Sequence, residues 1–150
     1  MQTSSTRSRQ QVVDLFEQRG VLPTRQRVDI ARMLLSHDQH LTADQVLSQV
    51  NAAGGGISKA TVYNTLGLLA RKGLIRELVI DPGRVVYDSN LSPHYHLYNI
   101  DSGELQDIAT DTIHIADLPE LPIGTAAVGV DVVIRVRNQT QDTDLVADHS

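Results

Sequence analysis

The triplet His94-Tyr95-His96 lies in a run of residues that favours a β-strand. Alternate residues of a strand project from one face, so the two imidazoles would emerge roughly 7 Å apart on the same side. Imidazole nitrogen suits iron, zinc and manganese alike. The pair is therefore compatible with a shared metal ion, although a His-x-His pair alone does not establish one.

A second chemical signal lies in residues 57–75, where one helical face is apolar and another is suited to DNA. The apolar positions recur at helical spacing and would face a core: Val62, Leu66, Leu69 and Ala70. A polar set projects from another side: Lys59, Tyr63, Asn64 and Arg71. Ser58 suits the N-cap, and Gly73 suits the left-handed position that ends a helix. This pattern predicts a recognition helix for the major groove.

Three further helices are predicted before this one. The first ends at Gly20, the second begins after Thr24, and the third opens with the capping box Thr42-Ala43-Asp44-Gln45. Two β-branched runs follow, residues 74–80 and 85–87, joined by a turn at residues 81–84. Helices followed by a hairpin predict a winged helix, within an α+β chain.

The remainder predicts a second, smaller domain. We expect a winged-helix domain at 1–88, a hinge at 89–93, an α/β dimerisation and metal-binding domain at 94–138, and a disordered tail at 139–150. Strands are expected at 94–100, 104–108 and 126–136, with a short helix within 111–118. So small a domain could hardly bury enough apolar surface alone, which favours a homodimer.

Charge and composition narrow the possible functions. Residues 1–88 carry 11 Lys and Arg against 8 Asp and Glu, whereas residues 89–150 carry 2 against 10. DNA is therefore the expected partner of the first half. The chain has no cysteine, which excludes disulfides and thiolate zinc sites. It has no apolar run of membrane length and no signal-peptide core, so we expect a cytoplasmic protein and no membrane partner.

These residues resemble the ferric uptake regulator family of bacterial metal-responsive transcription factors. Three segments carry the resemblance, which extends from about residue 10 to residue 137: Pro23-Thr24-Arg25-Gln26-Arg27, Lys59-Ala60-Thr61-Val62-Tyr63-Asn64-Thr65-Leu66, and His94-Tyr95-His96. Within the family, 61–66 and 118–122 look most like the iron response regulator branch. The resemblance implies a dimer in which a divalent metal, bound between the two domains, sets the spread of two DNA-reading heads.

The resemblance also implies a ligand set of three imidazoles and two carboxylates: His40, Asp88, His94, His96 and Asp107. In the alternative, His40 is a loop residue and the aspartates are solvated. The donor set would take one divalent ion per subunit, iron(II) or manganese(II) physiologically and zinc in samples. The family's structural four-cysteine zinc is absent. His114 and Asp131 fall near another site of some relatives, but only two of its four ligands match.

DNA contacts are expected on eight residues. Tyr63 and Asn64 match base-reading positions, where a ring can pack on a thymine methyl and an amide can bond adenine. Five others would contact phosphates: Arg25, Arg27, Lys59, Thr61 and Arg71. Arg84, at the wing tip, would contact the minor groove or the backbone. The expected partner is a palindromic, A/T-rich duplex. Leu22 stands where many relatives have a basic residue for the minor groove.

The sequence thus predicts a metal-responsive repressor of iron-homeostasis genes rather than an enzyme. A peroxide sensor with iron-catalysed histidine oxidation at the same site is the alternative, since the ligand set also resembles that of the family's peroxide sensors. Haem is a further possibility, although the Cys-Pro motif of some iron response regulators is missing. A metallohydrolase is disfavoured because five protein donors leave little room for water and substrate. A partner-binding module that no longer reads DNA remains a distinct alternative.

Overall fold

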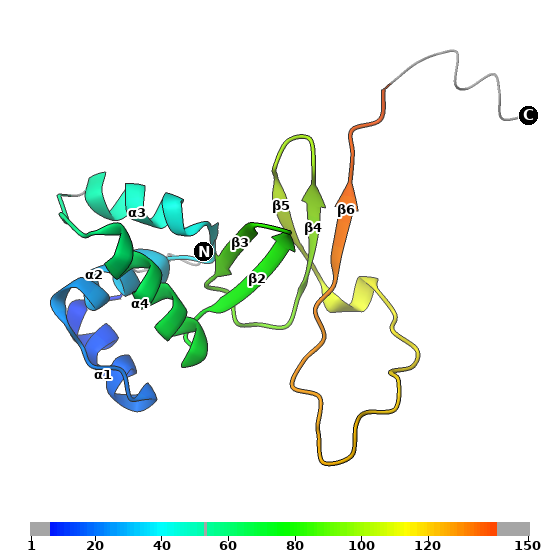
Figure 1. Ribbon diagram of the computed structural model, residues 1–150, viewed down its shortest axis with the longest axis horizontal. Helices are drawn as coiled ribbons and strands as arrows, with labels where there is room; N and C mark the ends of the chain where they lie inside the picture. Colours follow the sequence, from blue (N-terminus) through cyan, green and yellow to red (C-terminus); the bar gives the residue numbers. More distant parts are fainter. Residues whose placement is uncertain (1–6, 53, 141–150) are drawn as a thin grey trace, which may run out of the picture. The chain divides into compact units, whose positions relative to one another are not determined.

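The computed structural model describes residues 7–52 and 54–140, and the chain divides into two units, Met1–Ser92 and Pro93–Ser150. The helices of the first unit are α1 (Arg9–Arg19), α2 (Arg25–Leu34), α3 (Ala43–Ala52) and α4 (Lys59–Arg71). Its strands are β1 (His40–Leu41), β2 (Arg76–Asp81) and β3 (Arg84–Asp88). The second unit contains β4 (Tyr95–Asn99), β5 (Leu105–Ile108), the 3₁₀ helix η1 (Thr110–Thr112) and β6 (Val133–Val136) (Figure 1).

The helix starts of the first unit follow the capping signals. The side chains of Thr24 and Ser58 each accept a hydrogen bond from the backbone N–H three residues on. Thr42 and Gln45 form the predicted reciprocal pair, in which each backbone N–H donates to the other residue's side chain. At the other end of α4, Gly73 has a φ of 73°, the left-handed conformation that glycine adopts without strain.

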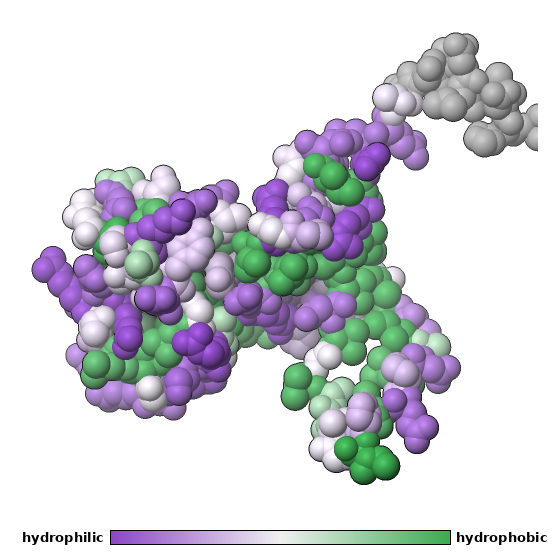
Figure 2. Space-filling model, viewed as in Figure 1, coloured by the Kyte–Doolittle hydropathy of each residue, from purple (hydrophilic) through white to green (hydrophobic). Residues whose placement is uncertain are grey.

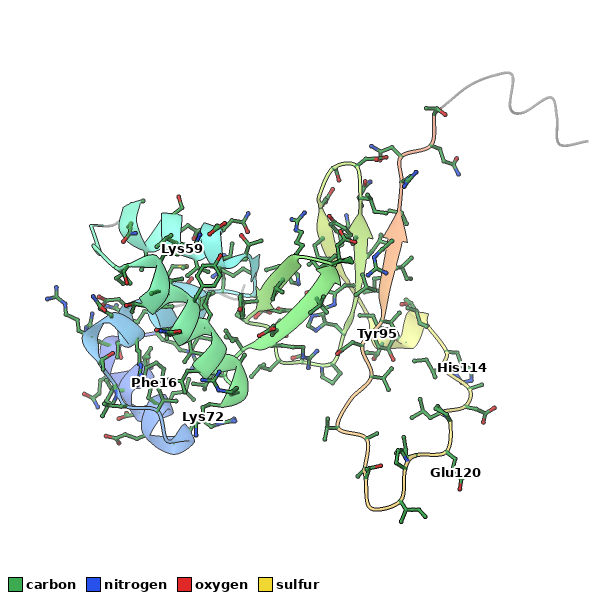
Figure 3. All side chains as sticks on the ribbon, in the orientation of Figure 1. Phe16, Lys59, Lys72, Tyr95, His114 and Glu120 are labelled. Atoms are coloured by element: carbon green, nitrogen blue, oxygen red, sulfur yellow. The ribbon has the colours of Figure 1, made fainter. Side chains whose placement is uncertain are left out.

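The core of the first unit lies among its four helices. Phe16 of α1, labelled in Figure 3, is completely buried, as are Leu66 and Leu69 of α4. The other fully buried members come from all four helices: Val12, Ile30, Ala31, Leu34, Val46 and Val62. Because one face of α4 is buried by this core, its opposite face is left for solvent or a partner.

The wing is a three-stranded antiparallel sheet of order β1-β3-β2, one strand more than the sequence predicts. β1 has only two residues, too short for an alternating pattern to be visible in the sequence. It pairs with the last residues of β3, so that His40 lies directly opposite Asp88. The predicted turn between β2 and β3 is confirmed, with Gly83 at a φ of 85°.

The second unit is built on a sheet of order β5-β4-β6. β4 and β5 are antiparallel, and His96 lies opposite Asp107. β4 and β6 are parallel, with His96 opposite Val133. The predicted strand pair and its turn at residues 101–103 are therefore confirmed.

Two predictions for the second unit are wrong in extent. The strand expected over 126–136 pairs only at Val133–Val136, and Val128 and Val130 upstream are exposed. A β-branched run forms a strand only where a neighbour takes its backbone hydrogen bonds, and β4 offers five residues for pairing. The helix expected within 111–118 is reduced to η1, since a short isolated helix without a packed face is marginal.

Most of the predicted tail, residues 141–150, lies outside the described residues. In the part of the chain that the structure describes, no helix has the length and apolar character needed to cross a bilayer.

Candidate metal centre and nucleic-acid interface

Three potential metal ligands of the second unit converge on one point. The Nε2 atoms of His94 and His96 are 3.1 Å apart, and their rings meet edge to face with centroids 4.6 Å apart. Asp107 Oδ1 lies 3.5 Å from His94 Nε2 and 3.6 Å from His96 Nε2. The strand register brings them together, because His96 and Asp107 are cross-strand partners and His94 directly precedes β4. Both imidazoles are buried.

The spacing of these three side chains is compatible with a shared metal ion. A charge-assisted bond would bring the carboxylate to about 2.8 Å from one ring nitrogen. Instead, Asp107 Oδ1 is almost equidistant from both nitrogens and too far for a good hydrogen bond to either. Two imidazoles that bind one tetrahedral ion have nitrogens about 3.3 Å apart, close to the distance between His94 and His96. The nitrogen and carboxylate donors therefore fit a divalent ion such as iron, manganese or zinc.

A second pair of potential ligands lies in the first unit. His40 Nε2 is 3.3 Å from Asp88 Oδ2, and Asp88 is fully buried. The other carboxylate oxygen, Oδ1, accepts a hydrogen bond from the backbone N–H of Asn90. An ionised carboxylate is costly to bury unless it is paired or bound to a metal, so this aspartate is not a solvated surface charge.

The position of His40 is fixed by the residue before it. The Gln39 amide donates to the carbonyl oxygens of Met33 and Leu34 at the end of α2. The Gln39 backbone N–H donates to Ser89 Oγ, and the Ser89 N–H donates to the Gln39 carbonyl. These bonds tie the segment before β1 to both α2 and the residue that follows β3. His40 is thus held in a defined place rather than in a loose loop.

His114 and Asp131, the possible second site, do not gather ligands in this way. Both are exposed, and His114 lies on the long segment between η1 and β6 (Figure 3). Among residues 7–52 and 54–140, no group of three His, Asp or Glu ligands includes either of them.

The solvent face of α4 carries four of the eight residues predicted to contact DNA. Lys59, Asn64 and Arg71 are exposed, and Tyr63 is 42% exposed. Lys59 lies in the first turn of α4 (Figure 3). Thr61 is half-buried and belongs to the cap, since its N–H donates to Ser58 Oγ and its hydroxyl accepts from Ser58.

The arginines predicted to contact DNA differ in their surroundings. Arg25 is exposed at the start of α2. Arg27 is half-buried, and its Nη1 donates to the Leu22 carbonyl oxygen, so it also closes the turn before α2. Arg84 begins β3 at the wing tip and lines a groove of about 480 Å³ together with Tyr63 and Tyr87.

The sequence does not reveal that Asp44 contacts the exposed face of α4. The sequence places it only within a capping box, but its Oδ1 accepts a hydrogen bond of 3.1 Å from the Tyr63 hydroxyl. Lys59 Nζ lies 4.0 Å from the same oxygen and 5.6 Å from the centre of the Tyr63 ring. The hydrogen bond to Asp44, more than any other cause, raises the pKa of Tyr63 above 10.0. Asp44 and Tyr63 are 19 residues apart on two helices, so no local pattern signals the contact.

The chain combines a winged helix, whose recognition face is exposed and polar, with clusters of imidazole and carboxylate groups. This combination is typical of metal-binding regulators of transcription. Comparison with known proteins gives the family. The model of the ferric uptake regulator family matches residues 18–118, and the chain belongs to that family.

Similar proteins agree with this assignment. The peroxide-responsive repressor PerR of Staphylococcus aureus is 34% identical over 92 residues, which cover 61% of this chain and 62% of that protein. The ferric uptake regulator of Pseudomonas aeruginosa with manganese has a TM-score of 0.68 at 25% identity, covering 85% of this chain and 98% of that one. The Vibrio cholerae ferric uptake regulator has a TM-score of 0.65 at 18% identity, covering 83% and 98%, and shows the fold alone.

These similarities confirm the α+β class and the family, and the family is one of regulators, not enzymes. The expected iron response regulator branch is not shown, since the similar curated proteins are peroxide-responsive repressors.

Proposed function

We propose that this chain is a metal-dependent, DNA-binding transcriptional repressor that responds to peroxide. The observation that carries the proposal is the convergence of His94, His96 and Asp107 on one point, in a chain of the ferric uptake regulator family. Repression takes place on DNA in the cytoplasm, where we place the protein. Each part of the proposal rests on a separate observation.

One divalent ion, in this proposal, takes ligands from both groups of residues. His40 supplies one nitrogen and Asp88 one carboxylate. Neither this pair nor the cluster of His94, His96 and Asp107 alone completes a six-ligand shell. Only five residues separate Asp88 from His94, so the backbone between them spans at most about 20 Å. That short connection supports a shared ion, which would couple metal occupancy to the setting of the DNA-binding unit.

The DNA-binding role rests on the exposed face of α4. Tyr63 and Asn64 read base edges, with phosphates held by cationic and hydroxyl side chains: Arg25, Arg27, Lys59, Thr61, Arg71 and, at the wing tip, Arg84. The excess of cations in residues 1–88 supports this assignment. We expect a palindromic, A/T-rich duplex, because a symmetric dimer presents two copies of the same reading surface.

Dimerisation is supported by the apolar side chains that the second unit leaves exposed. Several large ones lie between η1 and β6: Ile115, Leu118, Leu121, Ile123, Val128 and Val130. Figure 2 shows hydrophobic side chains on the outside of this segment. Large apolar side chains exposed in this number favour association, and a second copy of the same chain is the proposed occupant.

Peroxide is proposed as the signal because the similar curated proteins are peroxide-responsive repressors and the ligands are nitrogen and oxygen atoms only. His40, Asp88, His94, His96 and Asp107 would hold the ion. Iron(II) would supply the redox chemistry by which peroxide is reduced to water while one of its oxygen atoms is added to a ligand imidazole. Oxidised imidazole is a poorer ligand, so metal and DNA would be released together.

Iron-dependent repression of iron-homeostasis genes is the second candidate. It is favoured by the likeness to the manganese-bound ferric uptake regulator of Pseudomonas aeruginosa. Neither the donor set nor the similar proteins favour haem, and the iron response regulator branch depends only on short sequence phrases.

Mass spectrometry of the iron-loaded protein after peroxide exposure separates the two candidates. Peroxide sensing predicts the addition of one oxygen atom to His40, His94 or His96, together with loss of DNA binding. The manganese-loaded protein is the matched control and should stay unmodified. An iron-loaded protein that keeps unmodified histidines and full DNA binding after peroxide would refute peroxide sensing and leave iron-dependent repression.

A further inference from the structure

The carboxylate of Asp44 lies on the DNA-reading side of the first unit, where a negative charge would repel phosphate. Its side chain is 72% exposed, and it makes two contacts, both with α4. Tyr63 donates its hydroxyl proton to Oδ1, and the ammonium of Lys59 lies 4.0 Å from the same oxygen. The negative charge of Asp44 weakens binding to the phosphates of any DNA. Asp44 can favour binding at a specific site only through another interaction.

The contacts indicate what that contribution is. A tyrosine side chain on an exposed helix face can swing about two torsions, and a hydrogen bond at its tip restricts both. The Tyr63 hydroxyl is fixed by Asp44, and Lys59 Nζ lies 5.6 Å from the centre of the Tyr63 ring, within the range of a cation–π interaction. The ring is therefore held in one orientation before any partner arrives, which lowers the entropy cost of a specific contact.

We propose that Asp44 is a positioning residue for DNA reading, which holds the Tyr63 ring in the orientation that contacts a thymine methyl group. The inference rests on the proposed function, because it assigns a role within DNA binding. The same hydrogen bond to Asp44 is the main cause that raises the pKa of Tyr63 above 10.0.

A purely structural role for Asp44 makes a different prediction. Asp44 lies in the first turn of α3, where a carboxylate also stabilises the helix through its dipole. Removal of the side chain would then weaken α3 and all DNA binding alike. Positioning of Tyr63 predicts a selective loss of sensitivity to the thymine methyl.

The test compares duplexes that contain thymine or uracil, which differ only by that methyl. A duplex is first selected from a random library with the manganese-loaded wild-type protein. Each thymine is then replaced by uracil in turn, and the affinity is measured. Wild-type protein should bind about fourfold more weakly when the contacted methyl is removed, the value of one buried methyl group. In Asp44→Ala this ratio should fall to about one, whatever happens to the overall affinity.

Three variants complete the experiment. Asp44→Asn keeps an acceptor for the Tyr63 hydroxyl without the charge, and should retain the ratio. Tyr63→Phe should lose the ratio as Asp44→Ala does, and the double variant should be no worse than either single one. Gln45→Ala weakens the same helix start through its bond to Thr42 and should leave the ratio intact.

A ratio that persists in Asp44→Ala, or that Gln45→Ala abolishes equally, overturns the inference while leaving the proposed function in place. Wild-type protein that selects no duplex overturns the proposed function and the inference together.

Discussion

His96 and Asp107 face each other directly across the β4–β5 ladder, and the carboxylate lies 3.6 Å from the imidazole nitrogen. A pair in this register is set by the backbone, because a slip of one residue would turn either side chain to the other face of the sheet. The second unit therefore positions its ligands before any ion binds. Preorganised ligands bind a metal without a large ordering cost.

The first prediction concerns metal binding. His96→Ala removes one of two converging imidazoles and should lower manganese affinity at least about 10-fold, the usual effect of weakening a metal's ligand set. Isothermal titration calorimetry measures the change. His114→Ala is the matched control and should bind as the wild type does, because His114 is exposed on the segment before β6. Equal losses in both variants would contradict the assignment.

The same titration tests whether the His40–Asp88 pair and the cluster of His94, His96 and Asp107 share one ion. His40→Ala should lower the affinity of the single site that His96→Ala affects. Two independent sites would instead leave one full-affinity manganese ion in each variant.

The second prediction concerns the core of the first unit. Phe16→Ala should cost about 3–5 kcal/mol in the free energy of unfolding, because it leaves a cavity among fully buried side chains. Chemical denaturation followed by circular dichroism measures it. Leu22→Ala, at a site 69% exposed, should change stability by less than about 0.5 kcal/mol. A small effect at Phe16 would mean that the helices do not pack as described.

The third prediction concerns pH. The hydrogen bond to Asp44 raises the pKa of Tyr63 above 10.0, and burial does the same for Tyr87. A raised folded-state pKa means that the folded protein keeps these protons longer than the unfolded chain. The resulting stability is fully present below pH 10 and is lost as the pH rises through the folded values.

Phenolate absorbance measures this titration. Tyr63 and Tyr87 should ionise later in the folded protein than in denaturant. In Asp44→Ala, one of the late groups should ionise earlier. A titration curve that does not change in this variant would contradict the Tyr63–Asp44 contact.

The fourth prediction concerns assembly. Val128→Asp places a charge on the exposed apolar segment of the second unit and should convert the proposed dimer to a monomer in analytical ultracentrifugation. Val79→Asp is the control, since Val79 is also an exposed valine but lies in the wing. If Val128→Asp remains dimeric, the apolar segment is not the dimer interface.

Much of the first unit could be predicted from the sequence because its signals are local. Thr24 and Ser58 cap helices through hydrogen bonds that span three residues. Gly73 at the end of a helix and Gly83 in a hairpin turn adopt the positive φ of those positions. These features need no knowledge of the rest of the chain.

The features that were predicted wrongly or not at all depend on distant partners. The run around Val128 is strand-like in composition, but strand formation is decided by β4, which pairs only from Val133 onward. The two-residue strand at His40 exists only because β3 lies beside it. The contact between Asp44 and Tyr63 likewise joins two helices, and its sequence signal is limited to a capping box.

In the proposed function, the imidazole–carboxylate cluster controls DNA binding. The most direct test of this control is the affinity for a selected duplex, by fluorescence anisotropy, with manganese and with a chelator, for the wild type and for the His94→Ala/His96→Ala variant. The wild type should bind about 5- to 150-fold more tightly with manganese, the usual range of coupling between two sites. The double variant should bind equally weakly in both conditions. A double variant that responds to manganese as strongly as the wild type would contradict the account.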